Sequence, residues 1–153
     1  MAKTLVQEIK QSRPFDAIEF TAFLSLQRTA DVLMNRLTVL LKDYDMSFSQ
    51  FNILRILRGT PEGLPVGEIS ARMVRREPDL TRLLDRLENR RFVIRSRESR
   101  DRRVVTARIV DAGLRILEEL DPQVEGTEKA FFVGIDESKL IGLIELLDEL
   151  REN

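Results

Sequence analysis

The stretch that decides the fold runs from residue 72 to residue 108 and reads RMVRREPDLTRLLDRLENRRFVIRSRESRDRRVVTAR. It holds thirteen of the chain's 25 Lys and Arg residues, all of them Arg, against six acidic residues. The chain before it has balanced charges and the chain after it is acidic, so the formal net charge is only −1. This segment is here called the basic block. Since a polyanion responds to local charge, the basic block is the candidate binding site for a polyanion.

Within the basic block, the spacing of the apolar residues changes from a helical to an extended pattern. Between Leu80 and Leu87, leucines recur at intervals of three and four residues, which places them on one face of a helix. Between Phe92 and Ile109, two β-branched runs flank the polar segment RESRDRR, a pattern typical of two strands joined by a charged tip. A helix followed by an Arg-rich hairpin predicts a winged helix-turn-helix, whose second helix enters a major groove of DNA.

The same residues resemble a known family. The segment LTRLLDRLENRRFVIRSRESRDRRVVTARIVDAG (80–113) resembles the signature stretch of the MarR family of bacterial transcriptional regulators, including an Asp-x-Arg at the wing tip, here Asp101 and Arg103. Two flanking segments agree with this resemblance: FSQFNILRIL (48–57) is similar to the family's second helix, and PVGEISARM (65–73) is similar to its third. The resemblance covers most of the chain, although the terminal helices match only in pattern.

The two ends of the recognition helix carry separate signals. Glu77 and Pro78 are expected to mark its start, because Pro is tolerated in a first turn and acids there suit the helix dipole. At the other end, Arg91 stands where the family usually has Gly. A left-handed backbone at that position costs a non-glycine residue roughly 1 kcal/mol. This departure bears on the local turn and not on the fold.

Before the basic block, the apolar spacing predicts an arm and three helices. Their expected limits are residues 1–15 for the arm and 16–44, 48–58 and 65–73 for the helices. Ser47 and Gln50 have the spacing of a capping box, which supports a helix start at Phe48. The apolar face of the first helix is broader than one small core requires. It is either ordinary core or a surface for a partner subunit.

After the wing, Asp111 and Gly113 open another helix, which Pro122 must either kink or divide into two segments. Asp136 is a candidate N-cap for a last helix over residues 137–151, whose apolar side chains share one face. Terminal helices this apolar, in an acidic arm far from the basic block, indicate a dimerisation region.

These elements predict a mainly α (α+β) fold: a winged helix-turn-helix with a two-stranded wing, plus N- and C-terminal dimerisation helices. The expected regions are residues 1–45 for the N-terminal arm and helix, 46–109 for DNA binding, and 110–153 for the C-terminal helices. No apolar run approaches the roughly 20 residues needed to span a bilayer, and the first residues do not resemble a signal peptide. We therefore expect a cytoplasmic protein without membrane contact.

The composition argues against an enzyme. The chain has no Cys and no His, so it lacks thiol chemistry, the usual nitrogen and sulfur ligands of zinc, and the usual proton shuttle. We predict no catalytic residue, no metal site and no cofactor. Apart from Phe92, which is expected to belong to the core, no aromatic residue lies among the basic ones, which also argues against binding to single strands or RNA.

The family resemblance implies which residues contact duplex DNA. Arginine forks suit guanine edges and phosphates, and a hydrogen bond from Asp101 would orient Arg103 for groove entry. The implied contacts are Thr81, Arg82 and Arg86 in the major groove, Arg102 and Arg103 at the wing, and Arg75 and Arg76 on phosphates.

The arginines of the basic block also have a simpler interpretation, in which they do not contact DNA. A charged helix face is usually only solvated, which applies to the recognition helix as well. The arginines that follow that helix can equally pair with its own carboxylates or with the acidic arm. The residues concerned are Arg90, Arg91 and Arg95, with Asp85 and Glu88 as partners.

The function predicted from these observations is a homodimeric regulator that binds a pseudo-palindromic duplex site and is a repressor relieved by a small ligand. The resemblance implies an aromatic or phenolic ligand between the dimerisation and DNA-binding regions. Candidate lining residues are Phe20, Phe23, Phe48 and Phe51, for which core packing is the alternative. The alternative function is a non-enzymatic helical dimer whose basic block binds an acidic protein partner.

Overall fold

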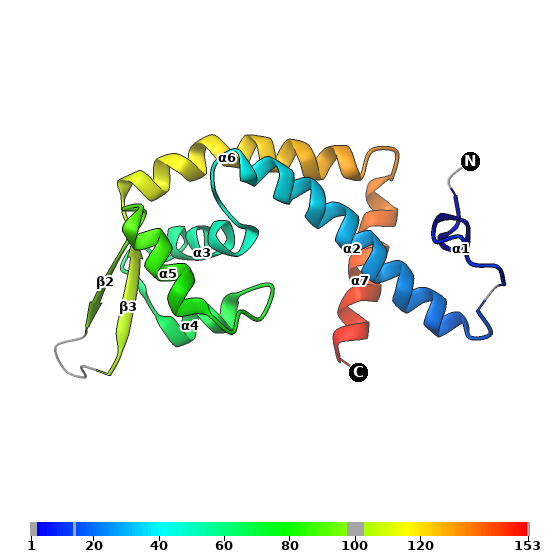
Figure 1. Ribbon diagram of the computed structural model, residues 1–153, viewed down its shortest axis with the longest axis horizontal. Coiled ribbons are helices and arrows are strands. Elements are labelled where there is room, and N and C mark those ends of the chain that lie inside the picture. The colour runs from blue at the N-terminus through cyan, green and yellow to red at the C-terminus, as the bar shows by residue number, and fades with distance from the viewer. Residues whose placement is uncertain (1–2, 14, 98–102, 153) are drawn as a thin grey trace.

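The computed structural model describes residues 3–13, 15–97 and 103–152, which form a mainly helical structure with one small antiparallel sheet (Figure 1). The predicted fold class is confirmed. The elements in chain order are α1 (Leu5–Glu8), α2 (Ile18–Lys42), α3 (Phe48–Arg58), β1 (Leu64–Pro65), α4 (Val66–Arg72), α5 (Leu80–Asn89), β2 (Val93–Arg97), β3 (Val105–Ile109), α6 (Asp111–Phe131) and α7 (Glu137–Glu152).

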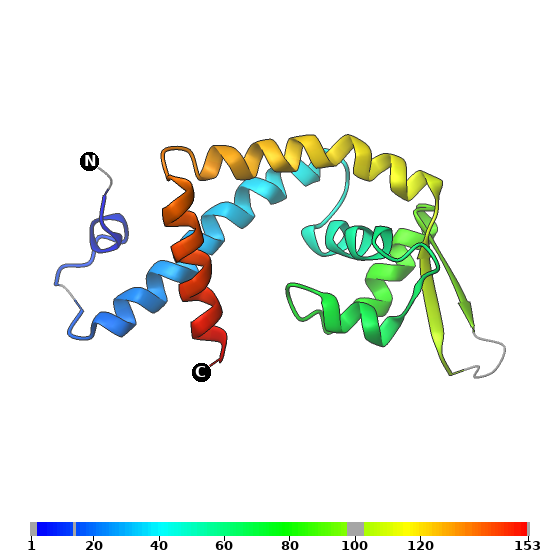
Figure 2. The ribbon, with the colours of Figure 1, turned by 180° about the vertical axis from the view of Figure 1, so that it is seen from behind.

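One apolar core holds the winged helix-turn-helix together. It is built from α3, α4, α5 and the sheet, and it is closed by the end of α2 and by α6. The C-terminal half of α2 lies beside the second half of α6, where Tyr44 contacts Gln123 and Arg36 stacks on Phe131 (Figures 1 and 2). The inward leucine face predicted for the recognition helix α5 is present, with Leu84 and Leu87 fully buried. Burying such a side chain contributes about 2 kcal/mol, which fixes the rotation of α5 and turns its polar face outward.

Helix α3 begins and ends where the sequence predicts. The Ser47 hydroxyl accepts a hydrogen bond from the Gln50 backbone N–H at 3.1 Å, and the Gln50 side chain accepts one from the Ser47 N–H at 2.9 Å. These two bonds form the predicted capping box, which satisfies two amide donors that the helix itself leaves unpaired.

The start of the recognition helix is two residues later than expected. Helix α5 begins at Leu80 with Asp79 as its N-cap, so Glu77 and Pro78 precede its first turn. The reason is a long-range contact: the Glu77 carboxylate accepts a hydrogen bond from the Ser49 hydroxyl on α3. Glu77 thus ties the turn to α3 and does not stabilise the α5 dipole.

The wing sheet has a strand that the sequence pattern did not indicate. The predicted hairpin strands are present as β2 and β3, and the order in the sheet is β1-β3-β2. Strand β1 pairs Leu64 with Ala107 and Pro65 with Thr106. This pairing fixes the base of the wing to the start of α4, and it leaves β2 as an edge strand.

Helix α6 opens as predicted and runs unbroken past Pro122, so Pro122 does not begin a fresh segment. Its first turn lies so close to the wing that a Cβ at Gly113 would clash with the carbonyl oxygen of Phe92. Asp136 caps α7 as predicted, since it accepts a hydrogen bond from the Lys139 N–H at 3.0 Å. Hydrogen bonds from Lys139 and Ser138 lower the pKa of Asp136 to about 2.

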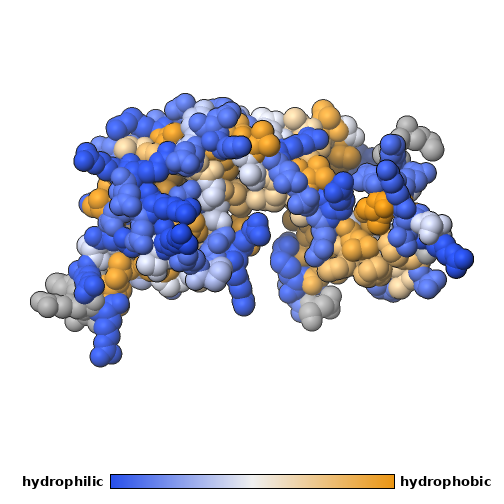
Figure 3. Space-filling view, in the orientation of Figure 1, coloured by the Kyte–Doolittle hydropathy of each residue, from blue (hydrophilic) through white to orange (hydrophobic). Residues whose placement is uncertain are grey.

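The terminal helices expose large apolar side chains. The N-terminal half of α2 and helix α7 project away from the core (Figures 1 and 2), and none of the described residues of α7 is buried. Apolar surface gathers over this end of the visible face, whereas the surface over the winged helix-turn-helix is mostly hydrophilic (Figure 3). The exposed side chains on these two helices are Ile18, Phe20, Phe23, Leu26, Val39, Ile141, Leu143, Ile144, Leu146 and Leu150. No helix in the described part of the chain is long and apolar enough to cross a membrane.

Arg91, which stands where the family that the chain resembles usually has Gly, has a left-handed backbone. Its φ is +59°, and its N–H donates to the carbonyl oxygen of Glu88 at 2.8 Å, which closes the turn after α5. The side chain is exposed, so the structure holds this conformation through the backbone.

We predict that Arg91→Gly stabilises the fold or leaves it nearly unchanged. Relief of roughly 1 kcal/mol of backbone strain offsets the added freedom of the unfolded chain, and glycine retains the backbone hydrogen bond. Urea unfolding measures the free energy. Arg82→Gly, at a helical position, is the matched control and should destabilise by about 1 kcal/mol. A loss of more than about 2 kcal/mol from Arg91→Gly would mean that the side chain makes a specific bond.

Candidate nucleic-acid interface

The outer face of α5 carries the residues predicted to read the major groove. Thr81, Arg82 and Arg86 are all exposed, because the buried leucines occupy the opposite face. Arg82 has one long ion pair, 3.8 Å to Asp79, in which both side chains are more than half exposed. Such a pair contributes little and breaks easily, so the Arg82 fork is available to a ligand.

The turn between α4 and α5 presents the two arginines predicted to bind phosphates. Arg75 and Arg76 are both exposed. The turn itself is held in place, since the N–H of Val74 donates to Asn52 Oδ1 on α3 at 3.1 Å. A fixed turn presents its charges at a constant distance from α5, as phosphate contacts that set the register require.

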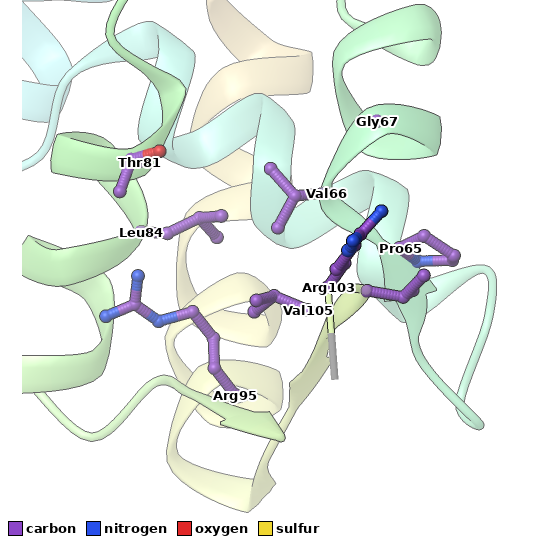
Figure 4. Close-up of a pocket in the computed structure, with 9 residues that line it drawn as sticks. Pro65, Val66, Gly67, Thr81, Leu84, Arg95, Arg103 and Val105 are labelled. Carbon is purple, nitrogen blue, oxygen red and sulfur yellow. The ribbon is translucent and has the colours of Figure 1, made fainter. Parts of the chain in front are cut away.

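The wing and the recognition helix meet at a notch of about 370 Å³. Figure 4 shows Thr81 of α5 and the wing residues Arg95 and Arg103 around this notch, with Val105 between the two arginines. The structure therefore brings Thr81 and Arg103 to one surface. Asp101 and Arg102, the other two predicted wing residues, lie outside the described residues.

Arg95 lies in this notch, but it is bound to acids of the recognition helix. Its Nη2 donates to Glu88 Oε2 and to Asp85 Oδ1, at 2.6 Å each. The Arg95 hydrogen bond lowers the pKa of Glu88, and the Glu88 hydrogen bond raises the pKa of Arg95. The pairing with Asp85 and Glu88 that the sequence left as an alternative is the one that forms.

Arg90 has a structural role that the sequence did not indicate. Its guanidinium donates to the carbonyl oxygens of Asp45, at 2.6 Å, and Tyr44, at 2.9 Å, and lies 4.6 Å from the centre of the Phe92 ring. These contacts tie the end of α5 to the turn after α2. Every residue has a backbone carbonyl, so the sequence does not indicate which carbonyls an arginine binds. Acidic side chains were therefore the only partners of Arg90 that the sequence could suggest.

The four phenylalanines proposed as ligand contacts are not brought together. Phe20 and Phe23 are about half exposed and stack on each other. Phe51 is buried in the core with its ring centre 6.5 Å from that of Phe48, and Phe48 lines a groove. The rings instead form two separate pairs, one on α2 and one on α3, because the two members of each pair are three residues apart on the same helix.

The groove that Phe48 lines has a volume of about 800 Å³ and lies between α1, α2, α3 and the α4–α5 turn. Its walls are mainly apolar, with charged side chains at Arg28, Asp31 and Arg75. Leu5 and Ile9 from the N-terminal arm also line it, which is the packing role that their apolar character allows. Among the described residues, no cluster of acidic side chains has the geometry of a metal site.

Comparisons with known proteins agree with this arrangement. A family model described as the MarR family matches residues 46–105. The HTH-type transcriptional regulator YwaE of Bacillus subtilis is 31% identical over 134 residues, which are 84% of this chain and 75% of that protein. The crystal structure of a MarR transcription factor from Planctomyces limnophilus is 33% identical, with a TM-score of 0.70, and covers 88% of this chain and 98% of that one. BpsR of Bordetella bronchiseptica shares the fold at 19% identity, with a TM-score of 0.76 over 85% of this chain and 98% of that one.

Proposed function

The chain belongs to the MarR family and is a non-enzymatic, DNA-binding transcriptional regulator, and from this premise we propose that it is a homodimeric repressor of a pseudo-palindromic operator. Residues 46–109 bind DNA in the cytoplasm, and residues 1–45 and 110–153 form the dimer. The observation that carries the proposal is the common exposure of Arg75, Arg76, Arg82 and Arg86 around α5. Thr81, Arg102 and Arg103 complete the proposed contact surface, with Asp101 orienting Arg103.

The exposed apolar surface of α2 and α7 supports a second copy of this chain as the partner. Isolated apolar residues on a surface are ordinary, but a contiguous patch of this kind marks an interface. A two-fold dimer places two recognition helices so that they read two inverted half-sites.

A titration distinguishes this function from binding to an acidic protein. Genomic DNA fragments that the protein retains are sequenced, and the site that they share is made as a duplex, here called the recovered duplex. Its binding is compared with that of a scrambled duplex of the same length. The proposal expects the recovered duplex to bind about a thousandfold more tightly. Equal binding of the two duplexes would favour the acidic-partner alternative, in which the basic block recognises charge alone.

We further propose that the groove beside Phe48 binds the ligand that relieves repression. DNA binding by BpsR is regulated by 6-hydroxynicotinic acid, a small aromatic acid. In this chain, Arg75 lines the groove and is also a proposed phosphate contact. A carboxylate bound beside Arg75 would compete with the phosphate for the same guanidinium.

Filling the groove tests this regulation. Met34→Trp places a large ring against the lining, so it should abolish release of the duplex by hydroxybenzoic or 6-hydroxynicotinic acids and leave duplex affinity unchanged. Fluorescence anisotropy of a labelled duplex measures both properties. Thr29→Trp, at an exposed α2 position outside the groove lining, is the matched control. Equal release from Met34→Trp and from the unaltered protein would place the ligand elsewhere.

A further inference from the structure

The recognition helix carries acids as well as arginines. Helix α5 has Arg82 and Arg86, and it also has Asp85 and Glu88. A helix in the major groove lies between two phosphate strands, so each unpaired carboxylate on it repels the DNA. Because Arg82 and Arg86 are the proposed DNA contacts, a positive charge from another element is needed to offset these two carboxylates when the helix binds.

Arg95 meets both carboxylates from the neighbouring element. It lies on β2, the edge strand, and its guanidinium reaches back to α5. Its Nε donates to Glu88 Oε2 at 3.0 Å, and its Nη2 donates to the same oxygen and to Asp85 Oδ1. The Arg95 backbone N–H donates to Glu88 Oε1 at 2.9 Å. Both oxygens of Glu88 are thus held by one residue of the wing.

The burial of this cluster separates Arg95 from the other arginines of the surface. Its side chain is 21% exposed, against 69% for Arg82. A partly buried guanidinium with donors committed to two carboxylates is poorly placed to leave them for a phosphate, because both acids would then lose their partner. Arg95 therefore acts on α5 and not on the DNA backbone.

We propose that Arg95 is a positioning residue for DNA binding, which offsets part of the negative charge of Asp85 and Glu88 and holds both carboxylates toward the wing and away from the phosphates. The inference rests on the proposed function in one respect, namely that α5 enters the major groove. It adds a role for a residue that makes no direct contact with DNA, and it explains how a helix with balanced charges binds a polyanion.

Removal of the guanidinium alone and together with its partners tests the role. Arg95→Met should weaken binding of the recovered duplex by about tenfold, since two carboxylates are left unpaired beside the phosphates. Adding Asp85→Asn and Glu88→Gln to Arg95→Met should restore affinity to within about threefold, because the repelling charges are gone. Arg95→Lys keeps the positive charge but loses the forked guanidinium, so its duplex affinity should lie between that of Arg95→Met and that of the unaltered protein.

The outcomes are decisive when the affinities are measured well below the melting temperature of every variant. If the triple variant binds as weakly as Arg95→Met, or if Arg95→Met binds like the unaltered protein, the proposed role is overturned. Should Arg95→Met fail to fold, the triple variant and Arg95→Lys still test the role. The triple variant removes both carboxylates, and Arg95→Lys keeps a positive charge beside them. Failure of the proposed function is a separate result, in which the unaltered protein binds recovered and scrambled duplexes alike.

Discussion

Replacing Ile144 and Leu147 by Asp is expected to convert the proposed dimer to monomers. Both residues lie on α7, where Ile144 is 57% exposed in the single chain. In a dimer their side chains would be buried against the partner, and each unpaired carboxylate there costs several kcal/mol, so the dissociation constant should rise by about a thousandfold or more. Duplex affinity should then fall by about a hundredfold or more, because the two half-sites are no longer bound as one unit.

Sedimentation at micromolar concentration measures this effect. Glu145→Lys is the matched control, since it reverses a charge on the same helix without altering an apolar side chain, and it should leave the dimer intact. A monomeric unaltered protein would remove the two-half-site mechanism. A double variant that remains dimeric would place the interface on surface other than α7.

Arg86→Ala is expected to produce the second large effect. If Arg86 contacts a base edge, its loss should cost roughly 1 to 3 kcal/mol on the recovered duplex and much less on a scrambled one, because base contacts carry the discrimination. Arg103→Ala should weaken both duplexes, since a wing arginine responds to phosphate charge and groove width more than to base identity. Titration of each variant against both duplexes separates the two roles.

Arg55 offers a control for this comparison. It is an exposed arginine on α3 that lies 5.8 Å from the Phe51 ring, outside the proposed contact surface, so Arg55→Ala should leave both affinities nearly unchanged. Equal losses from Arg86→Ala on the two duplexes would mean that α5 contributes charge and reads no base.

Features set by neighbouring residues could be predicted from the sequence. The leucine spacing located α5 and its buried face, and the Ser47–Gln50 pair located the start of α3. The positive φ of Arg91 was expected from the family resemblance, because Arg91 stands where that family usually has Gly. In each case the cause lies within a few residues of the effect.

Features set by distant residues could not be predicted in the same way. Strand β1 has only two residues and forms because β3 lies beside it, more than forty positions later. The start of α5 is displaced by a bond from Glu77 to α3, and Arg90 binds backbone carbonyls that have no sequence signature. The apolar groove likewise depends on how α1, α2 and α3 pack against one another, and of the four phenylalanines proposed to line it, Phe48 does so.

The central claim is that two recognition helices of one dimer read two inverted half-sites. Selection of bound sequences from a random duplex pool, followed by sequencing, tests it most directly. The predicted result is a pseudo-palindrome whose half-sites are centred about one helical turn, or 10 base pairs, apart. Enrichment of a single half-site without an inverted partner, or no enrichment at all, would contradict the account.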